Sequence, residues 1–254
     1  MAVYTQKFFI PSYAVGADNR LRLSALLQFQ QEAGERQMCE NGMSYGVLGE
    51  KRLAFLVTRL TSHITRLPEM NEPVQLHTWH RNVRGVQFFR CYTLTDANGA
   101  PLCESVTAFA LVDTENHRLL RPDALGDLAL PDDLSHTINC PDPTKEVPPA
   151  LIEVAAVKPR YSELDPNGHV NNTRYADFLC DNIPSGMARK NPTQLYIRFE
   201  RETRPDDLLT ISAAEERWQN NGVTGGVAWV AGKHTRGEAF VARLTYEDDY
   251  VRRF

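Results

Sequence analysis

The stretch YSELDPNGHVNNTRYADFLC, residues 161–180, joins a polar turn to the start of a helix. Asp165, Asn167 and His169 alternate with a proline and a glycine, and alternate residues of an extended segment point to one side. Apolar residues then recur at helical spacing as far as a proline, which predicts a helix from about Asn172 to Asn182. A carboxylate, an amide and an imidazole beside the free N–H groups of a helix N-terminus could carry out hydrolysis. Asp-Pro-Asn-Gly is also strong turn chemistry, so a turn with no catalytic role stays open at this point.

Two motifs of this chain resemble those of a known enzyme family. The run LDPNGHVNNTRYADF, residues 164–178, is similar to the signature of the acyl-acyl carrier protein (acyl-ACP) thioesterases. A second run, FERETRPD at residues 199–206, puts Glu202 on the catalytic glutamate of that family. Thr203 stands where plant members often have cysteine, which counts against a cysteine nucleophile here. The resemblance covers nearly the whole chain, including TWHRNVRGVQFFRCYTL at residues 78–94.

The resemblance implies an α+β fold of two tandem hotdog domains, each a long central helix wrapped by a curved antiparallel sheet. It implies hydrolysis of fatty acyl thioesters on acyl carrier protein, with no cofactor and no metal. With the proline-rich texture of the middle of the chain, it predicts an N-terminal hotdog domain that supplies the acyl pocket, a linker and a catalytic C-terminal hotdog domain. These span residues 1–120, 121–150 and 151–254.

Length and composition exclude several other classes of protein. A chain of 254 residues with 42% hydrophobic and 24% charged residues is ordinary for one large or two small globular domains. A net charge of −4 argues against broad nucleic-acid binding. No run approaches the ~20 apolar residues of a membrane span, and no signal or transit pattern opens the chain, so we expect a cytoplasmic protein. Five cysteines without a CxxC pair argue against a disulfide framework and a zinc site.

The two halves repeat one order of elements, with four strands after each helix. The first half predicts a strand at 8–15, a helix at about 23–38 and strands at 53–64, 74–81, 86–95 and 102–112. The second half predicts strands at 155–161, 195–202, 208–218, 223–233 and 238–246. An offset of 149 relates Phe29 to Phe178, and one of 134 relates Glu104 to Glu238, which suggests a duplicated unit. At offset 149 His169 falls on Arg20, so the chemistry should lie in the second half.

The residues named so far can be given roles in thioester hydrolysis. We expect Glu202 to activate or orient water, and His169 and Asn167 to bind the carbonyl or the water. Asp165 would fix the His169 ring and its tautomer. Whether Glu202 or His169 is the base stays open, and without the resemblance Glu202 would pass for a solvated strand charge. Cys180 is a poor nucleophile candidate, because 11 residues at ~1.5 Å per residue separate it from His169.

The acyl tail needs an apolar slot, and the acidic carrier protein needs a basic docking surface. Candidates for the slot lie along the first helix and its sheet: Leu26, Phe29, Phe55, Val57, Trp79, Phe88 and Phe89. Candidates for the docking surface are Arg160, Arg174, Arg198, Arg201 and Arg204. Three alternatives remain: an acyl-CoA thioesterase of the hotdog superfamily, a hotdog dehydratase, whose His-before-Phe-Pro signature is absent here, and a non-enzymatic acyl-binding module. The sequence does not decide chain length or whether the protein is a homodimer.

Overall fold

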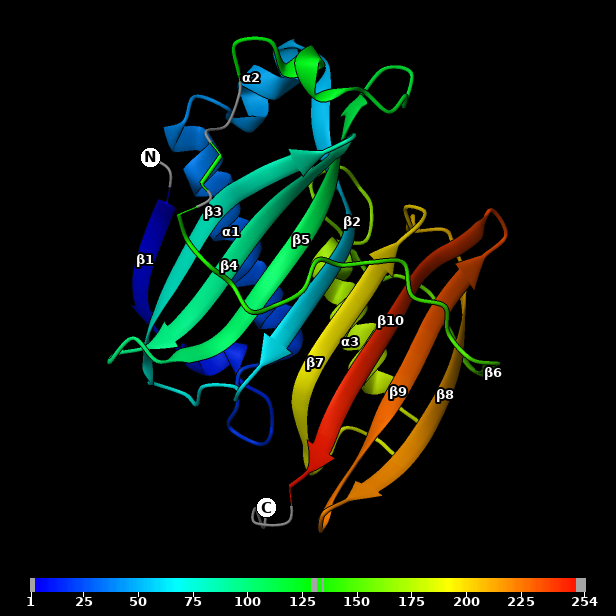
Figure 1. The fold of residues 1–254 in the computed structure, drawn as a ribbon. Helices are drawn as coiled ribbons and strands as arrows, with labels where there is room; N and C mark the ends of the chain where they lie inside the picture. The colour runs from blue at the N-terminus through cyan, green and yellow to red at the C-terminus, as the bar shows by residue number, and fades with distance from the viewer. Residues whose placement is uncertain (1–2, 129–131, 134, 250–254) are drawn as a thin grey trace.

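The computed structural model describes residues 3–128, 132–133 and 135–249. Its ten described strands form one antiparallel sheet in the order β1-β3-β4-β5-β2-β7-β10-β9-β8-β6 (Figure 1). The first half contributes β1 (Val3–Phe9), β2 (Leu53–Ile64), β3 (Pro73–Arg84), β4 (Gln87–Asp96) and β5 (Pro101–Asp113). The second half contributes β6 (Ile152–Val157), β7 (Lys190–Phe199), β8 (Leu209–Asn220), β9 (Val223–His234) and β10 (Gly237–Asp248). A large antiparallel sheet with few helices agrees with the predicted α+β class.

Helices cover one face of this sheet (Figure 1). Helix α1 (Leu23–Glu40) packs on β1 and β3, α3 (Tyr175–Asp181) packs on β9 and β10, and the two helices contact each other. Buried positions of α1 recur every three or four residues: Leu23, Leu26, Leu27, Gln30, Ala33, Gly34 and Gln37. A single hydrophobic core therefore runs between helices and sheet across both halves. Among the described residues, no helix is both long and apolar enough to cross a bilayer.

Some predicted boundaries were wrong by a few residues. The first strand ends at Phe9 rather than near residue 15, because Pro11 precedes a short 3-10 turn. The second helix begins as a 3-10 turn, Asn172–Arg174, before α3. Its N-cap is Asn171, whose side chain accepts a hydrogen bond from the Thr173 N–H at 2.9 Å.

The duplication is confirmed in the topology and in one local irregularity. The strand order β1-β3-β4-β5-β2 is repeated as β6-β8-β9-β10-β7. Thr58 and Thr193, 135 residues apart, lie at matching bulges, and their hydroxyls donate to Ala108 O at 3.0 Å and Thr245 O at 3.2 Å. The late offset is therefore 137, as from Ala108 to Thr245, and the predicted value of 134 was wrong. Hydrogen-bond register, which side-chain similarity does not reveal, decides the alignment.

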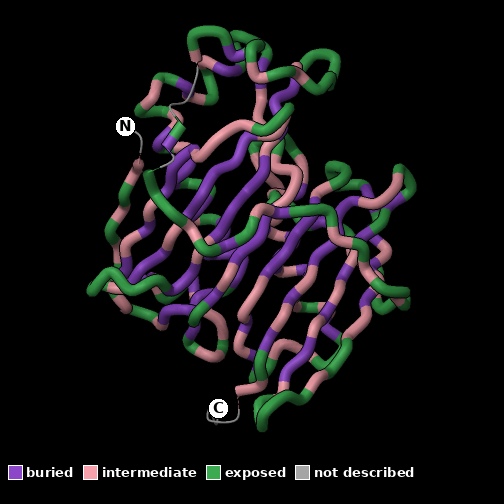
Figure 2. The backbone as a smooth tube through the Cα atoms, in the orientation of Figure 1, coloured by how far each residue is buried: buried purple, intermediate pink, exposed green. Residues whose placement is uncertain are grey.

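The halves meet edge to edge, and the linker crosses that seam. Strands β2 and β7 pair from Arg59–Arg198 to His63–Gln194. The linker runs over the sheet face opposite the helices, largely exposed on its outer side (Figure 2). Near the seam Glu146 receives hydrogen bonds from Arg243 at 2.6 and 2.9 Å. The proline-rich segment thus fastens one half to the other before it enters β6.

Candidate active site

The polar turn of the second half is closed by its own backbone. The Asp165 N–H donates to His169 O at 2.8 Å, and the Gly168 N–H donates to Asp165 O at 3.0 Å. Gly168 has a φ of +76°, a left-handed conformation that favours glycine. The Asp165 carboxylate accepts the backbone N–H groups of Asn167 at 2.8 Å and of His169 at 3.1 Å. The prediction that Asp165 fixes the His169 ring was wrong, since its carboxylate is used to hold the turn.

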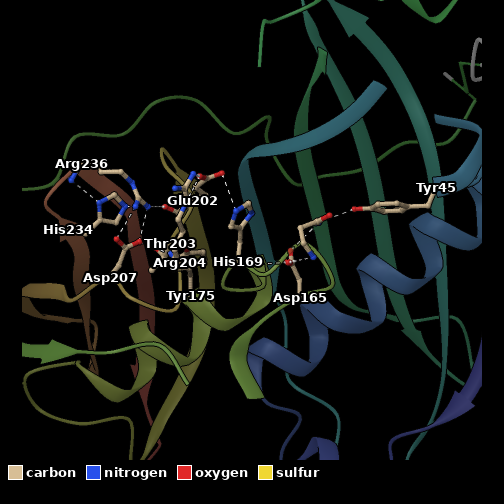
Figure 3. A network of polar contacts seen from close by, with 11 residues as sticks. Tyr45, Asp165, His169, Tyr175, Glu202, Thr203, Arg204, Asp207, His234 and Arg236 are labelled. Atoms are coloured by element: carbon tan, nitrogen blue, oxygen red, sulfur yellow. Dashed lines mark hydrogen bonds and ion pairs between the residues drawn. The ribbon is translucent and has the colours of Figure 1, made fainter. Parts of the chain in front are cut away.

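The His169 ring faces Glu202 instead (Figure 3). His169 Nε2 lies 3.5 Å from Glu202 Oε2, and the two side chains are 34% and 39% exposed. Glu202 belongs to the loop after β7, which is tied to the turn by the Val170 N–H donating to Thr203 O at 2.8 Å. The fold therefore brings together two of the predicted residues, 33 positions apart in the sequence, and leaves both accessible.

Arg204 holds the second oxygen of Glu202. Its guanidinium donates to Oε1 through Nε at 2.9 Å and through Nη2. Partial burial alone would raise the pKa of the Glu202 carboxyl. The hydrogen bonds from Arg204 and the charges of His169, Arg204 and Arg236 outweigh burial, so this pKa lies below its ordinary value. Oε1 is thus bound to a cation, while Oε2 stays directed at His169.

The first half contributes Tyr45 to the same site. This residue begins helix α2 (Tyr45–Glu50), and its hydroxyl accepts a hydrogen bond from Asn167 Nδ2 at 3.4 Å (Figure 3). Its side chain is 71% exposed. The sequence analysis missed Tyr45, because nothing in its local pattern distinguishes it from a surface tyrosine.

Cysteine chemistry finds no support at this site. Thr203, at the position where plant relatives often carry cysteine, is fully buried and accepts a hydrogen bond from the Tyr175 hydroxyl at 2.9 Å. Burial raises the pKa of the Cys180 thiol to about 12, so the reactive thiolate is scarce at neutral pH. Within the described part of the chain, no three His, Cys, Asp or Glu side chains form a metal site.

The residues predicted for the acyl slot are spread over three places. Phe55 and Phe88 line a cavity of about 30 Å³, bounded by Met38, Phe55, His80, Phe88, Arg90 and Phe109. Burial and the charge of Arg90 lower the pKa of His80 to about 4, so this wall is neutral at His80 and cationic at Arg90. A volume near that of one water means that the aromatic rings must turn before an acyl tail enters.

The other five predicted slot residues lie elsewhere. Trp79 and Phe89 pack with Cys140 of the linker in a separate cluster, and strand alternation puts them on the face opposite α1. Their assignment to the slot was wrong. Leu26 is fully buried in the main core, where Phe29 stacks on Phe8, and Val57 is half-buried in β2.

The five arginines predicted for docking differ in availability. Arg160 and Arg201 are exposed, and Arg174 is half-buried in an ion pair with Asp177 at 3.1 Å. Arg198 is buried and forms ion pairs with two glutamates, so it is not available to a partner. Arg204 is committed to Glu202.

With this geometry in hand, comparisons with known proteins show what the chain resembles. Residues 1–123 match the acyl-ACP thioesterase N-terminal domain, and residues 149–239 match the acyl-ACP thioesterase C-terminal domain. Oleoyl-acyl carrier protein thioesterase 1 of Arabidopsis thaliana is 23% identical over 254 residues, which cover 88% of this chain and 67% of that protein. The palmitoyl-acyl carrier protein thioesterase of the same plant is 24% identical and covers 82% of this chain and 54% of its own length. The chain thus spans between about half and two thirds of these relatives.

Solved structures share the whole fold. The 12:0-ACP thioesterase from Umbellularia californica superposes with a TM-score of 0.79 at 20% identity and covers 98% of both chains. An acyl-ACP thioesterase from Bacteroides thetaiotaomicron gives 0.78 at 20% identity, with 97% of this chain and 98% of that one covered. At such identities the likeness concerns the fold.

Proposed function

This chain belongs to the acyl-ACP thioesterase family, and from that premise we propose that it hydrolyses fatty acyl-ACP to free fatty acid and holo-ACP. The observation that carries the proposal is the pair of His169 Nε2 and Glu202 Oε2, 3.5 Å apart and accessible beside a closed turn. We also propose that residues 1–120 and 151–254 are tandem hotdog domains joined by a linker at 121–150, in a cytoplasmic protein. The repeated strand order around one helix each supports this division.

In the proposed reaction the Oε2 atom of Glu202 accepts a proton from water. The resulting hydroxide attacks the thioester carbonyl carbon, the C–S bond breaks, and the carrier thiolate leaves and takes up a proton. His169 and Asn167 bind the carbonyl oxygen as negative charge develops on it. Because Arg204 keeps the pKa of Glu202 low, the carboxylate is ready to accept a proton throughout the neutral range. Asp165 acts by holding the turn that aims His169.

The duplication supports a path for the acyl tail into the first half. At offset 135, Asn191 of β7 corresponds to Leu56 of β2, and at offset 149, Arg20 corresponds to His169. Arg20 donates a hydrogen bond to Asn191, so the matching arrangement puts Leu56 beside His169. Leu56 is apolar yet 52% exposed, and its neighbour Phe55 lines the cavity under α1. We propose that the tail passes Leu56 and enters this cavity.

Exposed cations beside the turn provide the proposed docking surface. Arg160 precedes the turn, Arg201 precedes Glu202, and Arg174 follows the turn at the start of α3. An acidic carrier protein would be attracted to such a cluster, and mobile salt would screen the attraction. Turnover of acyl-ACP should therefore fall as ionic strength rises, while turnover of acyl-CoA should change less.

The decisive experiment follows thiol release from purified acyl-ACP and from acyl-CoA of equal chain length. We expect release from acyl-ACP at a rate that Glu202→Gln lowers by ~100-fold or more. Equal turnover of the two substrates would favour a general acyl-CoA thioesterase. If the protein binds acyl thioesters but releases no more thiol than the Glu202→Gln variant, the hydrolase assignment fails and a binding module remains.

A further inference from the structure

Two side chains of the β9–β10 hairpin hold the main chain of Glu202 from behind. His234 Nε2 lies 3.1 Å from Glu202 O, and Arg236 Nη2 donates to the same carbonyl at 2.9 Å. The Arg236 backbone N–H donates to His234 Nδ1 at 3.1 Å. Since Nδ1 accepts, the proton of the neutral ring lies on Nε2, which therefore donates to Glu202. The imidazole is buried, so it is held in this orientation.

The same network reaches the cation that holds the Glu202 carboxylate (Figure 3). Arg236 donates to both oxygens of Asp207, at 3.0 and 2.8 Å. Asp207 in turn accepts the Arg204 backbone N–H at 2.6 Å. Arg204 then donates to Glu202 Oε1. The main chain and the side chain of Glu202 are thus fixed by one connected set of hydrogen bonds.

The first half lacks this tether at the matching place. Val230 pairs with Ala213 as Tyr92 pairs with Thr78, which relates β9 to β4 by 138 residues and His234 to Asp96. Both residues accept the N–H two positions later, since Asn98 N donates to Asp96 at 2.8 Å. In the described structure, the printed hydrogen bonds of Asp96 stay within its own hairpin. Leu67, the counterpart of Glu202 at offset 135, thus has no link of this kind.

Resting on the function proposed above, we propose that His234 is a positioning residue that aims Glu202 at His169. Glu202 lies in a loop, where a strand ladder does not hold it, and its side chain is part exposed. A misplacement of about 1 Å can cost ~100-fold in rate, so a base on a loop needs support of this kind. His234 supplies it through the carbonyl, and Arg236 with Asp207 supplies it through Arg204.

The test compares His234→Ala with His234→Gln in the full-length protein. Alanine removes the donor to Glu202 O, and kcat on acyl-ACP should fall between about 10- and 100-fold with KM little changed. Glutamine offers an amide N–H and an amide oxygen, so it should restore most of kcat. The acid limb of the pH profile should move to higher pH in His234→Ala, because Glu202, which faces His169, Arg204 and Arg236, loses its alignment with Arg204. A role in folding alone would lower thermal stability without moving this limb.

A double-mutant cycle separates this proposal from the one on which it rests. In a Glu202→Gln background, His234→Ala should cause no further loss of the residual rate. Asp96→Asn, at the matching hairpin position of the first half, serves as the control and should keep wild-type kcat. If Glu202→Gln abolishes turnover while His234→Ala keeps wild-type kcat and pH profile, the positioning role is overturned and the function stands. If Glu202→Gln itself is fully active, the proposed function fails first.

Discussion

The polar turns of the two halves share a backbone but carry different side chains. Gly16 and Asn19 donate to Arg20 O and Gly16 O at 2.8 and 3.0 Å, which repeats the hydrogen bonds of the second turn. Arg20, in place of His169, donates to Asp18 at 2.6 Å, to Lys190 O at 3.0 Å and to Asn191 across the seam. One copy of the turn thus presents an imidazole to an acid, and the other joins the two halves. The backbone alone does not confer catalysis.

The space under the sheet differs between the halves in the same way. At offsets 135 and 137, Phe55, His80 and Phe109 of the cavity correspond to Lys190, Glu215 and Tyr246. These three form a buried polar cluster, in which Tyr246 donates to Glu215 and Lys190 Nζ lies 4.0 Å from Glu215. A polar cluster fills the second copy of the space, whereas apolar rings line the first. One acyl tail per chain, held in the first half, follows from this difference.

The contrast between the two turns predicts the largest effect on activity. His169→Ala should lower kcat by roughly 100- to 1000-fold, because it removes a donor aimed at the developing oxyanion. Glu69→Gln, beside the turn of the first half, should leave kcat unchanged. Steady-state thiol release measures both, and circular dichroism checks the fold. Near-wild-type turnover by His169→Ala would remove the distinction between the turns.

The polar cluster of the second half predicts a loss of stability rather than of chemistry. Lys190→Met leaves Glu215 buried without its cation and should cost about 3 kcal/mol in the free energy of unfolding. Lys190→Met combined with Glu215→Gln should recover part of this loss, since no unpaired charge remains. Urea unfolding measures both variants. Equal stability of the single and double variants would show that the ion pair is not what holds this space closed.

The cavity of the first half predicts a change in substrate preference. Phe88→Ala enlarges the space and should favour longer acyl chains by up to about fourfold per added methylene, from ~0.8 kcal/mol of burial. Its counterpart through the strand pairing is Gly226, where an added Cβ would lie 2.3 Å from the Tyr246 hydroxyl. Gly226→Ala should destabilise the protein and leave the chain-length profile unaltered. A series of acyl-ACP substrates tests the pair.

The Glu202–Arg204 contact predicts a smaller effect, on pH dependence. The pKa of Glu202 lies below 4.5, so the carboxylate is present above that range and is lost as the pH falls through the lowered pKa. Arg204→Met removes the hydrogen bonds that lower it, so the acid limb of kcat/KM should move to higher pH. If the limb stays in place in Arg204→Met but vanishes in His169→Ala, then His169 is the base.

The sequence by itself determined the elements, the repeat and the two catalytic motifs. Turn chemistry, helical spacing and strand alternation are local properties, and they led to the turn at Asp165, the helix after it and the strands of both halves. The resemblance of residues 199–206 then singled out Glu202, which the local pattern alone would have left as a solvated strand charge.

Only the tertiary structure decided which groups meet. Alternation along a strand separates two faces without telling which one the helix covers, so Trp79 and Phe89 were assigned to the wrong side. Asp165 could have held either the ring or the backbone of His169, and only the closed turn shows which. His234 lies 32 residues from Glu202 in the sequence, and its hydrogen bond exists because two loops pack together. Contacts of this kind depend on the path of the whole chain, and a local pattern contains no record of it.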